Sequence, residues 1–139
     1  MREVLLHGGD DEVFDRSVVF ARRLAESFGA RLHVLYSVAE PLSSGWTAEV
    51  TPDRLPEMHQ AMEVEARDRL ALIIPMEDQE RLGVVIALGT GAADEDIVRY
   101  ANENAIDLIV THSPSSDDGA SELAHAVLDG ARCAVLVLR

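Results

Sequence analysis

The amino-acid sequence predicts an α/β fold, a doubly wound sheet of five parallel strands with helices on both faces. Five short apolar runs alternate with segments whose apolar residues recur at helical spacing. The runs are continuously apolar, with no regular polar alternation, which is typical of strands buried on both faces of a parallel sheet. We therefore expect right-handed crossovers, and a ligand crevice beyond the carboxyl ends of the strands.

The expected elements alternate along the whole chain. The strands are expected at residues 4–7, 32–38, 84–88, 108–111 and 134–138. The helices are expected where apolar residues repeat at helical spacing, over residues 11–28, 55–73, 94–105 and 123–128. No internal repeat or linker interrupts this pattern, so we expect one domain over residues 1–139.

Local signals mark the ends of the helices. Gly29 follows the first helix directly, in the position where a glycine usually ends a helix. Pro75 ends or kinks the second helix, because proline lacks the N–H that a helix interior needs. Acidic residues at 94–96 fall in the first turn of the third helix, where the helix dipole favours negative charge. Asp10 and Asp11 stand at the start of the first helix, and we expect them to cap it.

Composition limits the possible partners and chemistry. The net charge of −13 disfavours nucleic acid and anionic membranes, which both select basic surfaces. All basic residues are arginines, and the absence of lysine excludes Walker-type phosphate binding and Schiff-base catalysis. No apolar run is long enough to span a bilayer, and the N-terminus lacks the pattern of a signal peptide. We therefore expect a cytoplasmic protein.

The loop after the fourth strand lies where proteins of this fold commonly hold phosphate. A phosphate cradle needs glycines, which let backbone N–H groups approach an anion, and positive potential. This loop has one glycine, Gly119, and neither lysine nor arginine. It carries Asp117 and Asp118 instead. The sequence therefore predicts a phosphate site that has been lost or changed.

Several stretches in collinear order resemble the universal stress protein family. The run ARRLAESFGARLHVLYSV is similar to the first helix and second strand of that family. GTGAADEDIVRYANENAIDLIVTHS resembles its third-strand glycine, third helix and fourth strand, and GARCAVLVLR resembles its C-terminal strand. The resemblance implies the strand order 3-2-1-4-5 and a fold like that of the adenine nucleotide alpha hydrolases.

The family includes members that bind ATP and members that do not. The resemblance implies that ATP-binding members carry a G-x2-G-x9-G-[ST] loop after the fourth strand. Here His112 and Ser115 stand at the first two glycines, and Ser121-Glu122 at the closing pair. The loop is also shorter than the pattern requires. We therefore expect a member without ATP as a cofactor.

ATP-binding members also carry an aspartate after the first strand. In this sequence Gly9 takes that place, and Asp10 follows one position later. The alternative hypothesis is a nucleotide binder with a degraded loop. Its candidate crevice residues lie after the first, second and fourth strands: Gly8, Gly9, Asp10, Val38, Thr111, His112, Ser113 and Ser115.

A third hypothesis is a metal-dependent hydrolase. His7 closes the first expected strand and His112 closes the fourth, so both imidazoles are expected to point into one crevice with aspartates nearby. These are suitable ligands for zinc. The opposing interpretation treats both as structural histidines, because the sequence shows no tight ligand spacing. No group of residues provides nucleophile, base and oxyanion donor together, so we expect no enzyme.

The final strand favours self-association. It is apolar on both faces and leaves a sheet edge exposed unless another strand pairs with it. In the family that it resembles, the corresponding strands of two subunits pair antiparallel across a two-fold axis. We therefore expect a homodimeric regulatory or protective protein whose interface centres on Ala134, Val135, Leu136, Val137 and Leu138.

Overall fold

The structure, a computed structural model, describes residues 1–9, 12–37, 55–89, 92–112 and 118–139. Strands and helices follow in the order β1 (Glu3–Gly9), α1 (Phe14–Phe28), β2 (Arg31–Ser37), α2 (Leu55–Ile73), α3 (Met76–Leu82), β3 (Val85–Leu88), α4 (Ala93–Glu103), β4 (Leu108–His112), α5 (Asp118–Gly130) and β5 (Ala134–Leu138). No helix in the described ranges is long and apolar enough to cross a membrane.

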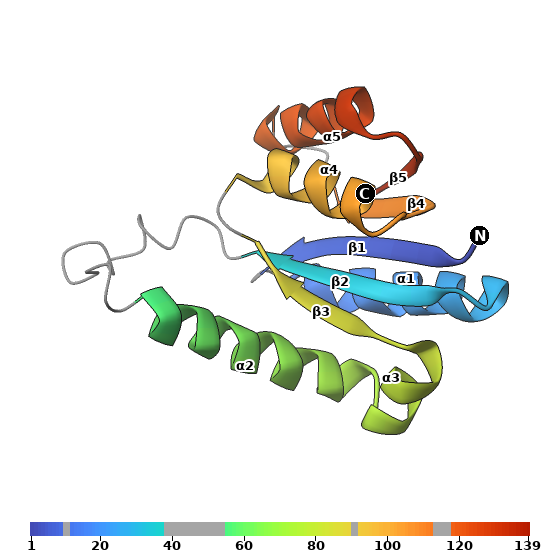
Figure 1. Cartoon of the computed structure of the whole chain (residues 1–139), viewed down its shortest axis with the longest axis vertical. Helices are drawn as coiled ribbons and strands as arrows, with labels where there is room; N and C mark the ends of the chain where they lie inside the picture. The colour runs from blue at the N-terminus through green and yellow to red at the C-terminus, as the bar shows by residue number, and fades with distance from the viewer. Residues whose placement is uncertain (10–11, 38–54, 90–91, 113–117) are drawn as a thin grey trace.

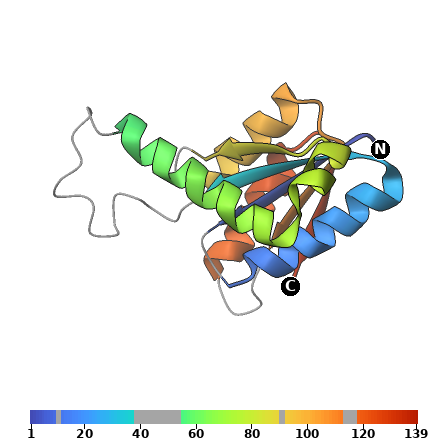
Figure 2. The ribbon, with the colours of Figure 1, turned by 90° about the horizontal axis from the view of Figure 1, so that it is seen from below.

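The five strands form one parallel sheet in the order β3-β2-β1-β4-β5, which confirms the predicted fold and strand order. Helices α4 and α5 cover one face, and α1, α2 and α3 cover the other (Figure 1). Viewed from the second face, α1 and α2 lie in front of the sheet (Figure 2). The layers therefore follow from the continuous apolar strands, which need cover on both sides.

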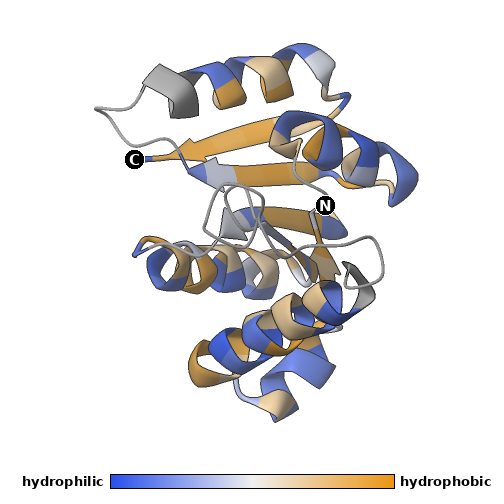
Figure 3. Cartoon of the chain, turned by 90° about the vertical axis from the view of Figure 1, so that its left-hand side faces the viewer, coloured by the Kyte–Doolittle hydropathy of each residue, from blue (hydrophilic) through white to orange (hydrophobic). Residues whose placement is uncertain are grey.

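Alternation along the strands divides the core into two clusters. On β1, Val4 and Leu6 pack toward α1 and α2, whereas Leu5 packs toward α4 and α5. All three side chains are fully buried. Apolar strands thus lie between helices whose outer faces are mostly hydrophilic (Figure 3). Any side chain on these strands can be assigned to one face by its position in the alternation.

Two features at helix ends differ from the sequence prediction. Helix α1 begins at Phe14, with Val13 in the cap position and no side-chain cap from that residue. Asp10 and Asp11, which the sequence predicts to cap this helix, lie outside the described residues. Pro75 does end α2, but the chain then forms the unpredicted helix α3, with Pro75 as its cap residue and Gly83 at its left-handed end.

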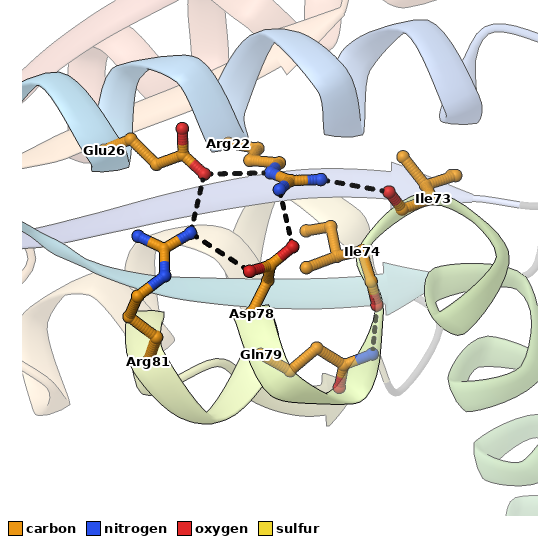
Figure 4. Close-up of polar contacts among 7 residues, drawn as sticks. All are labelled: Arg22, Glu26, Ile73, Ile74, Asp78, Gln79 and Arg81. Atoms are coloured by element: carbon orange, nitrogen blue, oxygen red, sulfur yellow. Dashed lines mark hydrogen bonds and ion pairs between the residues drawn. The ribbon is translucent and has the colours of Figure 1, made fainter.

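A closed ring of four charged side chains attaches α3 to α1 (Figure 4). Arg22 bonds Glu26 at 3.0 Å and Asp78 at 2.7 Å, and Arg81 bonds the same two carboxylates at 3.2 Å each. Arg22 also donates to the carbonyl oxygen of Ile73 at 3.2 Å, at the end of α2. One arginine therefore links three helices. Linked charges of this kind contribute more than an isolated surface pair.

Two glycines at the end of β1 permit close packing. A Cβ added to Gly8 would lie 2.8 Å from the Phe14 ring, and one added to Gly9 would overlap the carbonyl oxygen of Ser37. Phe14 in turn packs edge-on against Tyr36, with ring centroids 5.4 Å apart. These glycines are therefore required by contacts inside the chain, whatever ligand the crevice holds.

We expect replacement of Glu26 by glutamine to weaken the acid sensitivity of folding. Hydrogen bonds from Arg22 and then Arg81 hold the pKa of Glu26 below its ordinary value of 4.5. The stabilisation by this carboxylate is present above the unfolded pKa and is lost as pH falls through the lower, folded pKa. Urea unfolding at about pH 7 and about pH 3 should show a smaller loss of stability for Glu26→Gln than for the unmodified chain.

The matched control is Glu103→Gln, at an exposed glutamate near the end of α4. This variant should lose as much stability on acidification as the unmodified chain. Equal losses for both variants would show that the ring does not carry the effect.

A second expectation concerns Gly8. Gly8→Ala should destabilise the fold by about 1–3 kcal/mol, because the new methyl group presses on the Phe14 ring. In a Phe14→Leu background the same change should cost less, because a smaller side chain leaves room for it. Chemical denaturation of the unmodified chain, the two single variants and the double variant measures this coupling. Equal costs in both backgrounds would contradict the packing argument.

Candidate functional site

The carboxyl ends of the five parallel strands lie together at one end of the sheet. Strand β1 pairs with β2 on one side and with β4 on the other, so the strand order reverses there. Ligands of doubly wound folds bind at such a reversal. The ends of β1 and β4 therefore define the candidate site.

The structure brings part of the predicted residue set to this end of the sheet. Gly8 and Gly9 end β1, and Thr111 and His112 end β4. The other predicted crevice residues lie outside the described residues: Asp10, Val38, Ser113 and Ser115. The structure therefore places only the predicted crevice residues that lie on strands.

The two candidate metal ligands do not share a pocket. His7 has the same position in the alternation as Leu5 and bonds Ser37 at 3.2 Å, on the α4 face. His112 alternates with Val110 and bonds Arg16 of α1 at 3.3 Å, on the opposite face. The expectation that both imidazoles point into one crevice is therefore wrong. Among the residues that the structure describes, no three potential ligands come together as a metal group.

The α4 side of the site is polar and buried. The Asp96 side chain is only 2% exposed and accepts a bond from Arg99 at 2.6 Å. Gly89 lies beside it, and a Cβ there would overlap the Ser37 hydroxyl. Thr111 is buried on this face too, and its hydroxyl has no hydrogen-bond partner among the residues that the structure describes. This side can offer hydroxyl and carboxylate groups to a ligand, but the described residues place no cation there apart from Arg99.

The α1 side of the site carries two arginines that the sequence analysis missed. Arg16 reaches from the first turn of α1 to His112 at the end of β4. Arg69, on α2, donates to the carbonyl oxygen of Gly9 at 3.3 Å and lies 4.6 Å over the Phe14 ring. Positive charge therefore comes to the strand ends from helices, although the loop after β4 supplies none.

A further polar group lies near the amino ends of the strands, at the opposite end of the sheet from the candidate site. The buried imidazole of His33 is 2.7 Å from the Glu3 carboxylate and 2.7 Å from the Tyr100 hydroxyl. Burial, and secondly the charge of Glu3, raise the pKa of Tyr100. The Cys133 thiol also has a raised pKa, first because of burial. Neither group has the lowered pKa of a reactive nucleophile, so both are structural.

Comparison with solved structures identifies proteins of the same fold. A universal stress protein in complex with cAMP has a TM-score of 0.66 at 18% identity, covering 99% of this chain and 96% of its own. A universal stress family protein from Burkholderia pseudomallei gives 0.63 at 23% identity, covering 98% and 94%. One from Archaeoglobus fulgidus in complex with dAMP gives 0.58 at 17% identity, covering 100% and 98%. At these identities the likeness establishes the fold alone.

Sequence comparison establishes the family. No curated protein sequence matches this chain significantly. The sequence model of the universal stress protein family, however, matches residues 8–139, which includes every element from the end of β1 to β5. The chain therefore belongs to the universal stress protein family.

Proposed function

We propose that this chain is a small cytoplasmic, homodimeric universal stress protein that regulates or protects, without catalysis and without binding ATP. The observation that carries the proposal is the altered phosphate loop after β4. The structure begins α5 at Asp118, earlier than the sequence predicts, so Asp118 and Gly119 belong to that helix. The sequence between β4 and α5 is SPSSD, which offers no glycine and no cation and ends in Asp117. A triphosphate there would meet like charge in place of backbone donors.

His112 adds a steric reason against ATP. It stands where the ATP-binding pattern has its first loop glycine, and its imidazole lies against Arg16. A glycine at that point lets the backbone approach a phosphate closely, whereas a ring on Cβ occupies part of that space. The backbone cradle is therefore obstructed at its first position.

The exposed edge of the sheet supports a homodimer. Strand β5 is terminal in the strand order and pairs with β4 alone within the described sheet. Its residues from Val135 to Leu138 are each half-buried, although all are apolar. Pairing with a second copy would satisfy the open backbone groups and cover these side chains. The net charge of −13 argues against nucleic acid as the partner.

A second candidate function is adenine nucleotide binding at the carboxyl ends of the strands. Two solved proteins of this fold are in complex with cAMP and with dAMP. In this chain Arg16 brings a guanidinium to the end of β4, which restores part of the positive potential that the loop lacks. The metal-dependent hydrolase gains no such support, because His7 and His112 lie on opposite faces of the sheet.

Light scattering at micromolar concentration tests the dimer. The unmodified chain should have twice the mass of one subunit, and Val137→Asp should be monomeric, because a charge in the paired strand would be desolvated. Leu72→Asp is the matched control, because Leu72 is 88% exposed on α2, which packs against β3 at the other end of the strand order. It should remain a dimer. A monomeric unmodified chain would rule out the proposed assembly.

Mass spectrometry of small molecules released from the purified protein, with a calorimetric titration of ATP, tests the ligand proposal. We expect no bound ATP and no saturable ATP binding at micromolar concentration. The reason is the acidic, glycine-poor sequence of the loop. Micromolar affinity for ATP would overturn the main proposal, and co-purified adenine nucleotide of any kind would favour the second candidate.

A further inference from the structure

One side of helix α1 exposes aromatic side chains. Phe20 and Phe28 are 38% and 54% exposed, and they are two of the three phenylalanines in the chain. Leu24 lies midway between them in the sequence and is partly buried against the core. Residues at this spacing form an apolar row along one side of a helix. Contiguous exposed apolar surface marks places where a partner binds, whereas isolated exposed apolar residues are common.

The same side of α1 carries two arginines. Arg16 is four residues before Phe20 and Arg23 is three residues after it, so both lie beside the apolar row. Both arginines are exposed. Within the described residues, neither guanidinium lies within ion-pair distance of an aspartate or glutamate. We call Arg16, Phe20, Arg23, Leu24 and Phe28 the outer stripe of α1.

The carboxylates of α1 lie on the other flank of the helix. Asp15 bonds Arg69 of α2 at 3.4 Å, and Glu26 belongs to the ring of charges that joins α1 to α3. Arg16 instead reaches His112 of β4 at 3.3 Å. These contacts fix the rotation of α1 about its axis. The outer stripe therefore faces away from α2 and α3, and it is apolar and positively charged.

The outer stripe differs in charge from the rest of the chain. The net charge of the chain is −13. Val64, an exposed apolar residue of α2, lies between Glu63 and Glu65, and the nearby Arg67 is paired with Glu63 at 2.9 Å. An acidic partner is therefore repelled by the protein as a whole and attracted at the outer stripe. Charge complementarity thus indicates the kind of partner that this stripe fits.

We propose that the outer stripe of α1 binds an acidic amphipathic helix of another protein. Apolar side chains of that helix would pack on Phe20, Leu24 and Phe28, and its carboxylates would bond Arg16 and Arg23. Aromatic and arginine side chains are enriched among the residues that dominate such interfaces. The stripe is about 18 Å long, which suits about three turns of a helix packed along it. The inference goes beyond the proposed function, because it requires neither the dimer nor a nucleotide.

Two other occupants fit the outer stripe less well. A second copy that met it across a two-fold axis would bring Arg16 and Arg23 against the same two arginines, and like charges repel. An anionic membrane is an extended surface that repels a chain with a net charge of −13. A short helix spans only about two screening lengths at physiological ionic strength, so it experiences mainly the charges beside it. The charges therefore favour a segment of another protein.

A synthetic peptide tests this surface. The probe is a labelled helical peptide of about eighteen residues, with leucines on one face and glutamates on the other. Fluorescence anisotropy should show saturable binding to the unmodified chain, with a dissociation constant on the order of 10 μM. A peptide of the same composition in shuffled order has the same charge but no apolar face, and it should bind about tenfold more weakly. Equal affinities, or no binding of either peptide, would overturn the proposal.

Variants locate the binding surface. The double variant Arg16→Gln, Arg23→Gln should reduce the affinity for the acidic peptide about tenfold or more, and Phe20→Ser about fivefold or more. The matched controls lie on α2: Arg67→Gln, at an exposed arginine, and Leu72→Ser, at a residue that is 88% exposed. Both controls should change the affinity less than about twofold. Thermal melting curves confirm that each variant is folded. Equal losses in the controls and in the stripe variants would show that the peptide binds elsewhere.

The other occupants give different results. If light scattering shows that Phe20→Ser converts a dimer to a monomer, a second copy covers the outer stripe and the inference is wrong. If the unmodified chain sediments with phosphatidylglycerol vesicles and the double arginine variant does not, the stripe binds a lipid surface and the inference is again wrong. Peptide binding that depends on the stripe, with unchanged mass and no sedimentation, would support the proposal.

Discussion

The rest of the structure depends on the burial of the centre of β1, from Val4 to Leu6. This strand pairs on both sides, with β2 and β4, and helices cover both of its faces. Its core residues, Val4, Leu5 and Leu6, have no exposed surface. A parallel strand in this position requires a crossover helix on each face, and it fixes the point at which strand order reverses. The location of the crevice is thus a consequence of how the core is built.

Side chains alternate between the two faces of the sheet along each strand. This alternation also places different polar groups on the two sides of the crevice. Residues His7 and Thr111 face α4 and α5, where the surroundings are buried and include the Asp96 carboxylate. Residue His112 faces α1, where it meets the guanidinium of Arg16. One position along a strand is enough to exchange these surroundings. A polar, acidic side and a basic side therefore lie at the ends of the same strands.

Much of the fold could be predicted because it depends on local patterns. Continuous apolar runs identify buried strands, and Gly29 ends α1 in the left-handed conformation that the sequence suggests. Helix α3 was missed because its stability comes from tertiary contacts. Its ion pairs join Asp78 to Arg22 and Arg81 to Glu26, and each partner is more than fifty positions away in the sequence. Local periodicity contains no information about such a partner.

The candidate site was only partly predictable for the same reason. The sequence places Gly8 and Gly9 correctly at the end of β1, but a glycine pair does not reveal that its space is filled by Phe14 and Ser37. The contact between Arg16 and His112 spans ninety-six positions of sequence, and it depends on which face His112 occupies. Neither residue belongs to a sequence motif that would mark it as part of a site. Only the folded structure shows that the two side chains are in contact.

The acidic composition and a site for an anion are compatible because electrostatic interactions in salt are short-ranged. At physiological ionic strength the screening length is about 8 Å, so a phosphate beside Arg16 experiences mainly the groups in its own corner. A nucleic acid extends over many such lengths and would meet the net negative surface. The net negative charge therefore bears on extended polyanions, whereas the surroundings of Arg16 bear on a small anion beside it.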